Sequence, residues 1–231
     1  MRANYKRTMD RLFKRLFLWS DPVARDGPAQ MACDEALLGA ASGPVLRVFR
    51  WARPWVSAGY FVDWQTASRK RPDLPVCRRW TGGGVVVHDG DFTFTLTAPR
   101  HEPWARLRAQ ESYLRLHEAL TEALRESNPD VSLSNHSGAA GNDCFAGPVR
   151  HDVLLRGEKI AGGAQRRTKQ GLLHQGSIQG PRLKDDFASR LAAALAEDVE
   201  EWETPDGFEE KTARLTAEKY AHREFLQRAN L

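Results

Sequence analysis

The chain has 231 residues, of which 41% are hydrophobic and 28% are charged, and it carries a formal net charge of +4. These values are ordinary for a soluble globular protein and suit one domain with a sizeable core. No run of residues approaches the roughly 20 apolar positions that span a bilayer, so we expect no transmembrane segment. No basic block with interleaved aromatic residues stands out in the central region, so nucleic acid is not an expected partner.

Residues 1–26 are expected to form a basic N-terminal extension. Between Met1 and Trp19, basic residues alternate with leucine and phenylalanine, which favours a partly ordered segment, with a surface-lying amphipathic helix as the alternative. The segment has some likeness to a targeting sequence, but it lacks a clean apolar core and a small-residue cleavage site. The remaining residues, 27–231, are expected to form a single domain.

The apolar pattern of this domain indicates helices and strands in alternating groups. Helical spacing predicts four helices, over residues 28–41, 104–126, 184–196 and 209–228. Short apolar or alternating segments predict strands, at residues 45–51, 55–60, 76–79, 85–88, 92–97, 131–133, 153–155, 159–164 and 172–179. Strand groups separated by helices, with hairpins among the strands, predict an α+β fold with a mixed, largely antiparallel sheet packed with helices.

A glycine-rich segment between two of these strands is the most informative part of the chain: Arg78-Arg79-Trp80-Thr81-Gly82-Gly83-Gly84-Val85-Val86-Val87-His88. Three consecutive glycines cost backbone entropy, so a folded chain retains them where a positive φ or a close backbone approach is needed. The two arginines offer planar donors suited to carboxylate or phosphate. The segment predicts a loop around an anionic or carbonyl-bearing ligand; a tight turn with two solvated arginines is the alternative.

A second segment, about sixty residues later, combines a cysteine with a lysine. Cys144 follows a stretch rich in serine, asparagine and glycine, which implies a loop. Arg156-Gly157 predicts a hairpin turn with Lys159 just beyond it, and Gly162-Gly163 again requires a close backbone approach. A cysteine needs a nearby cation to become a thiolate at neutral pH, and a lysine beside a thioester can polarise its carbonyl. The predicted turn could bring these two residues together.

Together, these segments resemble the lipoate–protein ligase and octanoyltransferase family, whose catalytic domain shares its fold with biotin ligases. The family's pattern of two arginines, Thr-Gly-Gly-Gly and a histidine is matched by Arg78, Arg79, Thr81, Gly82, Gly83, Gly84 and His88. Its pattern Gly-x-Lys-Ile-x-Gly-x-Ala-Gln is matched by Gly157, Lys159, Ile160, Gly162, Ala164 and Gln165. The match runs from about residue 27 to about residue 226, so residues 27–231 resemble the family's catalytic domain as a whole.

Within the family, the chain looks like the cysteine-dependent octanoyl-[acyl-carrier-protein]:protein N-octanoyltransferases. Their Cys-Phe pair, with a proline four residues after the cysteine, is reproduced by Cys144, Phe145 and Pro148. The resemblance implies that Cys144 takes an octanoyl, or lipoyl, group from an acyl carrier protein thioester and holds it as an acyl-enzyme. A lysine of a lipoyl-carrier protein, either glycine cleavage H protein or an E2 lipoyl domain, then receives the group. We expect no tightly bound cofactor, and a monomer.

The resemblance also assigns roles to the other motif residues. Lys159 is implied to orient the carbonyl and to favour the thiolate. His88 is implied to orient the glycine loop or to aid proton transfer. The substrate pocket is implied to be lined by Arg78, Arg79, Thr81, Gly82, Gly83, Gly84, Gly162 and Ala164. A mildly basic surface is suited to docking an acidic acyl carrier protein.

Two other functions remain open. The first is an ATP-dependent lipoate–protein ligase, which would use ATP and Mg, hold lipoyl-adenylate with Lys159 and dispense with Cys144. Where the transferases have Pro-Ser followed by Tyr-Glu, this chain has Pro148-Val149-Arg150-His151-Asp152, and Asp152 before an apolar run is reminiscent of the ligases' Asn-Asp-Leu segment. About fifty residues follow Ile178 and are predicted to form two helices, which favours a transferase, or a ligase whose accessory domain is a separate chain. The second is a non-catalytic carrier-binding protein; a biotin ligase is disfavoured because no Gly-Arg-Gly-Arg loop is present.

The cysteine content indicates reduced thiols. Three cysteines are an odd and sparse set, which favours a cytoplasmic protein without a disulfide framework. Cys33 and Cys77 fall in apolar patterns and are expected to be buried small hydrophobes. The spacing of the cysteines relative to His136, His151 and His174 matches no zinc pattern, so we expect no metal site.

Overall fold

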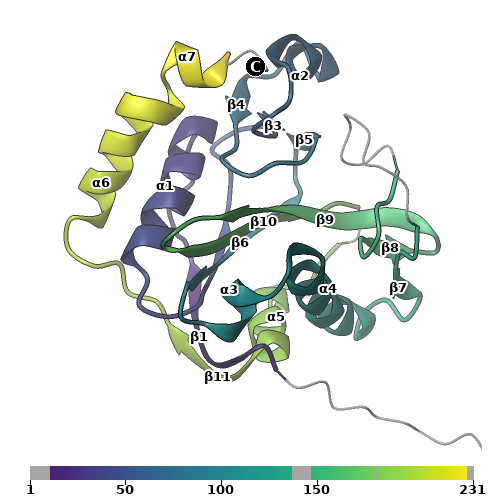
Figure 1. The fold of residues 1–231 in the computed structure, drawn as a ribbon. Helices are drawn as coiled ribbons and strands as arrows, with labels where there is room; N and C mark the ends of the chain where they lie inside the picture. Colours follow the sequence, from purple (N-terminus) through teal and green to yellow (C-terminus); the bar gives the residue numbers. More distant parts are fainter. Residues whose placement is uncertain (1–10, 137–146, 181, 228–231) are drawn as a thin grey trace, which may run out of the picture.

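The computed structural model describes residues 11–136, 147–180 and 182–227, which form two sheets with helices around them (Figure 1). The large sheet has, in spatial order, β11 (Ala196–Glu201), β1 (Phe13–Ser20), β2 (Val45–Phe49), β6 (Phe92–Pro99), β10 (Gly171–Ile178), β9 (Glu158–Arg167), β8 (Val153–Leu155) and β7 (Val131–Leu133). The small sheet has the order β4 (Val76–Arg78), β3 (Trp55–Ala58) and β5 (Val85–His88).

Most neighbouring strands are antiparallel. In the large sheet only the pairs β11–β1 and β1–β2 are parallel, and in the small sheet only β3–β4. The run β2–β6–β10–β9–β8–β7 is antiparallel throughout. The predicted α+β class and the mixed, largely antiparallel sheet are therefore confirmed.

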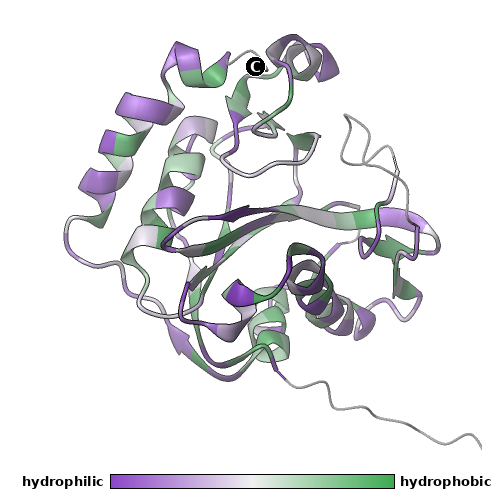
Figure 2. Cartoon of the chain, viewed as in Figure 1, coloured by the Kyte–Doolittle hydropathy of each residue, from purple (hydrophilic) through white to green (hydrophobic). Residues whose placement is uncertain are grey.

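Helices cover both faces of the large sheet. One side carries α1 (Gly27–Ala40), α6 (Phe208–Leu215), the π-helical turn η1 (Thr216–Tyr220) and the short α7 (Arg223–Leu226) (Figure 1). The other side carries α3 (Pro103–Arg106), α4 (Ala109–Arg125) and α5 (Phe187–Leu195), and α2 (Trp64–Lys70) packs on the small sheet. Figure 2 shows α5 as mostly hydrophobic, whereas α6 exposes many hydrophilic residues. None of the helices described is long and apolar enough to span a bilayer.

The main core lies between the large sheet and the α4–α5 side. Apolar residues of β2 and β6 pack there against α4 and α5, and all are buried: Leu46, Phe94, Leu96, Leu116, Leu120 and Leu191. A smaller core lies between α1 and the sheets and includes Cys33 and Cys77. This second core supports the strands that form the functional site.

The N-terminal prediction is wrong from Phe13 onward. Residues 13–20 form β1, an interior strand between β11 and β2, and not an extension or a surface helix. Phe13 and Leu16 are buried in the main core, whereas Trp19 is buried in a second cluster, in which Phe17 packs edge-on against Trp202. The buried side chains of this strand follow every third residue and belong to two clusters, so the alternation of a half-buried strand is lost and the sequence resembles an amphipathic helix.

Three further elements differ from the predictions. The helix predicted over 104–126 is broken where Leu107 and Arg108 adopt extended backbone angles, so α3 and α4 are separate. The helix predicted over 209–228 is likewise divided into α6, η1 and α7. Strand β11 was not predicted because its sequence is acidic; its charged, exposed side chains are typical of an edge strand.

Candidate active site

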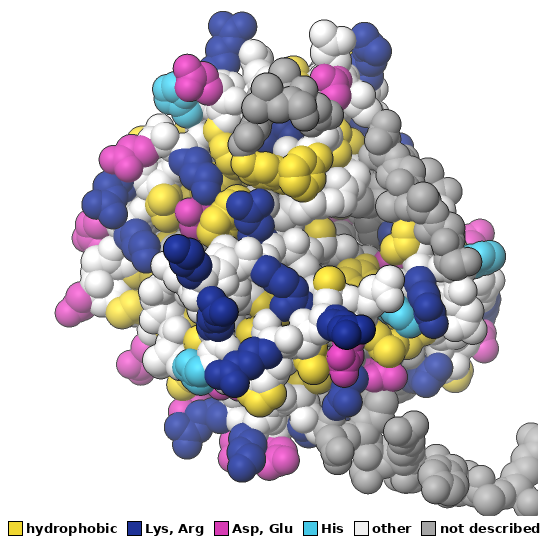
Figure 3. All heavy atoms as spheres, viewed as in Figure 1, with side chains coloured by type: hydrophobic (Ala, Val, Ile, Leu, Met, Phe, Trp, Pro, Cys, Tyr) yellow, Lys and Arg dark blue, Asp and Glu magenta, His cyan; other side chains and the backbone are white. Residues whose placement is uncertain are grey.

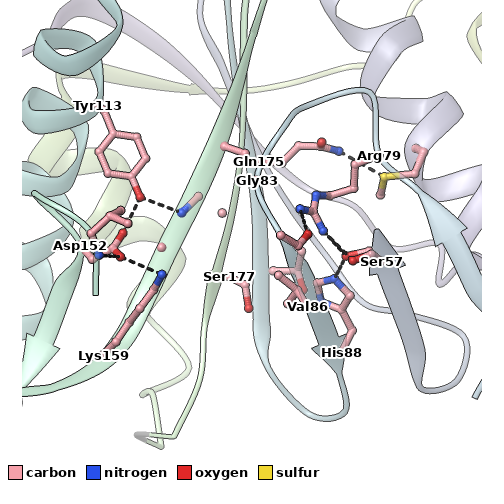
Figure 4. Close-up of a pocket in the computed structure, with 18 of the residues that line it drawn as sticks. Ser57, Arg79, Gly83, Val86, His88, Tyr113, Asp152, Lys159, Gln175 and Ser177 are labelled. Atoms are coloured by element: carbon pink, nitrogen blue, oxygen red, sulfur yellow. Dashed lines mark hydrogen bonds and ion pairs between the residues drawn. The ribbon is translucent and has the colours of Figure 1, made fainter. Parts of the chain in front are cut away.

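A cavity of about 90 Å³ lies between β9 and β10 of the large sheet and the small sheet. Figure 4 shows two groups of side chains that face each other across it, Tyr113, Asp152 and Lys159 on one wall and Ser57, Arg79 and His88 on the other. Among the described residues, the lining comprises Met31, Phe49, Trp51, Ser57, Arg79, Gly83, Gly84, Val86, His88, Thr93, Tyr113, Gly147, Val149, Asp152, Lys159, Gly162, Gly163, Ala164, Gln175, Gly176 and Ser177.

Lys159 is placed in the pocket by a tight hairpin. Arg156 and Gly157 both have positive φ, 52° and 90°, and they turn the chain from β8 into β9. Two successive residues with positive φ match the right-handed twist of the flanking strands. The hairpin predicted from Arg156-Gly157 is therefore confirmed, and Lys159 lies at the start of β9 with its side chain only 7% exposed.

Asp152 holds Lys159 in place. Lys159 Nζ lies 2.7 Å from Asp152 Oδ2, and the Asp152 side chain is fully buried. The same carboxylate accepts the Tyr113 hydroxyl on Oδ1 at 2.6 Å and the Val149 amide on Oδ2 at 2.8 Å. Tyr113 Oη in turn accepts the Gly163 amide at 3.0 Å. A buried carboxylate with this many donors is fixed, so the ammonium that it binds is fixed as well.

The glycines of β9 give the lysine room to cross the strand. A Cβ on Gly162 would lie 2.8 Å from Lys159 Cε and 2.9 Å from Nζ. A Cβ on Gly163 would lie 2.2 Å from His174 Nε2. A side chain at Gly163 is therefore excluded, and one at Gly162 would displace the Lys159 ammonium. The wall presents a fixed positive charge to the cavity, which is suited to stabilising negative charge on a carbonyl oxygen.

Arg79 holds the opposite wall together. Its NH1 donates to the carbonyl and the hydroxyl of Ser57, at 2.8 and 2.7 Å. Its NH2 donates to the carbonyls of Gly82 and Gly84, at 3.1 and 2.8 Å. The guanidinium thus ties the glycine loop to β3. Arg79 lines the pocket as predicted, but it is buried and bound to the main chain, so the alternative of a solvated arginine is wrong for this residue.

His88 belongs to a buried hydrogen-bond chain on this wall. Its Nε2 lies 2.7 Å from Ser57 Oγ, and its Nδ1 lies 2.8 Å from Asp91 Oδ2. Burial by itself raises the pKa of Asp91, but His88 and the hydrogen bonds that Asp91 accepts outweigh it and hold the pKa below its ordinary value. The imidazole is stacked on Trp51, with ring centroids 4.2 Å apart. His88 therefore connects the polar groups of the loop to the apolar part of the cavity.

Three residues predicted to line the pocket do not line it. Arg78 is fully buried and donates through NH1 to the carbonyls of Gly59, Tyr60 and Val62, so it ties β4 to the turn after β3. The Thr81 hydroxyl donates to Gln175 at 2.7 Å from behind the loop, and Gly82 contributes only its carbonyl to Arg79. The other predicted residues among those described line the cavity: Arg79, Gly83, Gly84, His88, Lys159, Gly162 and Ala164.

Several pocket residues were not predicted. Tyr113 lies on α4, whose apolar stripe indicates core packing, and nothing in its local sequence distinguishes it from a core residue. Asp152 was not predicted to line the pocket, although it resembles part of the ligases' Asn-Asp-Leu segment. Gln175 donates to Asp34 at 2.6 Å beneath the pocket, and Ser57 sits mid-strand. These positions become functional candidates only through contacts with residues far away in the chain.

Cys144 lies outside the described residues, and its assignment as nucleophile stays a prediction. The next described residues along the chain, Gly147 and Val149, line the cavity. Cys33 and Cys77 are buried as predicted, and burial raises the pKa of each thiol to about 12. Neither is therefore a thiolate at neutral pH, and neither lines the cavity. Within the described parts of the chain, no group of three His, Cys, Asp or Glu side chains is placed to hold a metal ion.

Residues 26–215 match the model of the lipoyl protein ligase A/B catalytic domain. The chain belongs to this family. This lipoyl protein ligase A/B catalytic domain is 33% identical to octanoyltransferase LipM of Moorella thermoacetica over 189 residues. The aligned region covers 74% of this chain and 67% of that protein. The chain is 33% identical over 178 residues to octanoyltransferase LipM of Oceanobacillus iheyensis, covering 71% and 63%. The chain thus spans about two thirds of the length of these relatives.

Solved structures share the fold of this lipoyl protein ligase A/B catalytic domain. The Thermoplasma acidophilum protein Ta0514 with bound lipoic acid superimposes with a TM-score of 0.74, at 21% identity, covering 93% of this chain and 99% of that one. Lipoate-protein ligase A bound with ATP gives a TM-score of 0.70, at 21% identity, covering 93% and 98%. At such identities the likeness establishes the fold alone.

Two histidines behind the Lys159 wall predict that acid destabilises the fold. His117 and His174 are fully buried; burial lowers the pKa of His117 to about 4 and that of His174 well below its ordinary value. The unfolded chain protonates both near pH 6.5, so between that pH and about 4 it binds more protons than the folded chain. The free energy of unfolding should have its full value above about pH 6.5. At lower pH it should decrease, by up to about 1.4 kcal/mol per pH unit for each histidine.

Denaturant unfolding measured from pH 7.5 to pH 5 checks this expectation. His117→Gln should flatten the pH dependence, whatever it does to the absolute stability. His101→Gln, at a position 64% exposed, should leave the slope as in the wild type. An equal slope in all three proteins would contradict the assignment.

Proposed function

We propose that this chain transfers an octanoyl, or lipoyl, group from an acyl carrier protein thioester, through a Cys144 acyl-enzyme, to a lysine of a lipoyl-carrier protein. The observation that carries the proposal is Lys159, fixed by Asp152 on the wall of an otherwise largely apolar cavity. The octanoyltransferase relatives support the same chemistry. A cavity with a largely apolar surface and the Lys159 ammonium on one wall suits a fatty acyl chain that ends in a polarisable carbonyl.

In the first half-reaction, the Cys144 thiolate attacks the thioester carbonyl carbon. The new C–S bond forms, the bond to the carrier sulfur breaks, and the carrier leaves as a thiol after taking up a proton. Negative charge develops on the carbonyl oxygen in the transition state, and the Lys159 ammonium stabilises it. Asp152 and Tyr113 hold that ammonium in position.

In the second half-reaction, the neutral amine of the acceptor lysine attacks the acyl-cysteine carbonyl. A C–N bond forms, the Cys144 sulfur leaves as a thiolate, and the surplus proton of the amide nitrogen passes to solvent. The acceptor is a lipoyl-carrier protein, either glycine cleavage H protein or an E2 lipoyl domain. We further propose that the enzyme works as a monomer, in the cytoplasm, where Cys144 stays reduced.

Asp152 favours a second candidate function. Its likeness to the Asn-Asp-Leu segment of the ligases is consistent with an ATP-dependent lipoate–protein ligase, in which Lys159 binds lipoyl-adenylate. A non-catalytic carrier-binding protein would need neither Lys159 nor Cys144. The three functions differ in their need for ATP and for a thiol.

Intact-protein mass spectrometry with octanoyl–acyl carrier protein, without ATP, tests the proposal. The expected result is an adduct of one octanoyl group that disappears in Cys144→Ala. The adduct should persist in the control variant Cys77→Ala, which makes the same substitution at a buried cysteine. Absence of an adduct, with lipoylation of the carrier only when ATP and free lipoate are added, would make the chain a ligase. No turnover under either condition would leave a binding protein.

A further inference from the structure

Six basic side chains gather around the turn that joins β9 to β10: Arg100, Arg106, Arg166, Arg167, Lys169 and Lys211. Arg106 Nε donates to the Arg100 carbonyl at 3.0 Å, and Arg167 NH1 donates to the Ala105 carbonyl at 2.8 Å. The Arg100 amide donates to the Gln170 carbonyl in the turn itself, at 2.8 Å. Lys211 of α6 lies close to the same turn, because its side chain and that of Gln170 both approach Gly39. A Cβ added at Gly39 would lie 2.8 Å from Lys211 Nζ and 3.4 Å from Gln170 Nε2. We call this set the basic face.

None of the six makes an ion pair with any carboxylate that the structure describes. Elsewhere on the described surface, arginines are commonly paired, as in Arg15–Glu200 at 2.9 Å and Arg71–Asp73 at 2.7 Å. Glu102, the acid in the same segment, lies 3.6 Å from His101. Figure 3 shows the dark-blue side chains gathered across the middle of the molecule. Clustered cations whose charge is not balanced by a nearby carboxylate create a positive potential, which attracts an acidic partner.

The basic face is continuous with the rim of the pocket. Ala164 lines the cavity, and Arg166 follows two residues later on the same side of β9. The Arg166 guanidinium lies 5.1 Å above the rings of both Tyr60 and Trp80, and Trp80 directly precedes the glycine-loop residues. Phe61, next to Tyr60, is 69% exposed. A cation over aromatic rings beside an exposed phenylalanine is typical of the centre of a protein-binding surface.

The distance from this face to Lys159 distinguishes the donor from the acceptor. Arg167 lies eight positions after Lys159 along β9, which at about 3.3 Å per residue is roughly 26 Å along the strand. An acceptor lysine has a short side chain, so its domain must sit directly over the cavity. A carrier that holds its acyl thioester at the end of a long flexible arm can dock at this distance and still deliver the thioester to the cavity.

We propose that the basic face binds the acidic carrier protein that donates the acyl thioester. The inference rests on the proposed function. Arg100 and Lys169 are the best positions to test, because both side chains are exposed and no hydrogen bond or ion pair fixes either in the described structure.

The test compares a large with a small donor. Octanoyl–acyl carrier protein requires the basic face, whereas the uncharged thioester octanoyl–N-acetylcysteamine enters the cavity without it. In the double variant Arg100→Glu, Lys169→Glu, the kcat/KM for acylation by the carrier should fall by about tenfold or more at low salt. The difference in kcat/KM between this variant and the wild type should decrease as the ionic strength rises. Acylation by the small thioester should stay as in the wild type.

Two controls accompany the test. Lys14→Glu with Arg69→Glu makes the same change of net charge at exposed positions on β1 and α2, and it should leave both rates unchanged. Arg100→Lys with Lys169→Arg keeps the charge and should retain the wild-type rates. Calorimetric titration of each protein with acyl carrier protein gives a readout that is independent of turnover.

Several outcomes would overturn the proposal. One is an equal loss of acylation rate with both donors in the double variant. Another is a double variant that keeps both the wild-type acylation rate with the carrier and the wild-type affinity for it in the titration. A third is normal loading combined with slower transfer from the preloaded enzyme to a lipoyl domain, which would assign the face to the acceptor. Failure of the wild type to be acylated by either donor would instead refute the proposed function, and the titration would still decide whether the face binds the carrier.

Discussion

Lys159→Met is expected to reduce the rate of acyl transfer by about 100-fold or more, since it removes the charge that stabilises the carbonyl oxygen in the transition state. It should also lower the free energy of unfolding by about 3–5 kcal/mol, because it leaves the buried carboxylate of Asp152 without its cation. Single-turnover acylation with octanoyl–acyl carrier protein measures the first effect, and denaturant unfolding measures the second.

The double variant Lys159→Met, Asp152→Asn separates these two effects. A neutral amide at position 152 removes the uncompensated charge and still accepts the Tyr113 hydroxyl, so stability should recover substantially. Activity should remain as low as in the single variant. Recovery of activity together with stability would show that Lys159 only supports the fold, and the proposed electrostatic role would be wrong.

Gly59→Ala is expected to displace the glycine loop and abolish the pocket. A Cβ at this position would lie 1.9 Å from the Gly83 carbonyl oxygen and 2.8 Å from that of Gly82, and both are main-chain atoms that cannot rotate away. The loop must move, which breaks the contacts that Arg79 makes with Gly82 and Gly84. The free energy of unfolding should fall by about 1–3 kcal/mol, as for overpacked sites, and acylation should be lost.

Gly82→Ala is the matched control for stability. A Cβ there meets no heavy atom within 4 Å, and Gly82 does not have positive φ, so its melting temperature should equal or slightly exceed that of the wild type. Thermal unfolding of the two variants side by side makes the comparison. Equal melting temperatures for Gly59→Ala and Gly82→Ala would contradict the close approach of Gly59 to the loop.

Much of the fold could be predicted from local sequence. The antiparallel strands β6 and β10 and the hairpin at Arg156-Gly157 were predicted because alternation and turn residues act over a few positions. Strands β1 and β11 were missed for opposite reasons. The first contributes buried side chains to two clusters and so loses its alternation, and the second lies at the edge of the sheet with its charges in solvent.

The site was predicted in outline only. The glycine loop, His88 and Lys159 belong to long motifs, so their presence at one cavity could be expected. Arg78 and Arg79 were indistinguishable in the sequence, yet the first binds carbonyls of the turn after β3 and the second faces the cavity. Adjacent residues in extended backbone point to opposite sides, so neighbouring arginines with the same chemistry take different roles.

By itself, the sequence determined most of the strands and helices, though not β1 and β11, and it identified two motifs whose residues line the cavity, because periodicity, turn residues and motif spacing are local properties. Only the tertiary structure decided that Tyr113 and Asp152 fix Lys159, that Arg79 rather than Arg78 lines the cavity, and that six cations without a carboxylate partner among the described residues gather around one turn. Burial and charge pairing depend on groups brought together from distant positions. A carboxylate 39 residues from its tyrosine, with the hydroxyl 2.6 Å away, is specified by packing and not by any neighbouring residue.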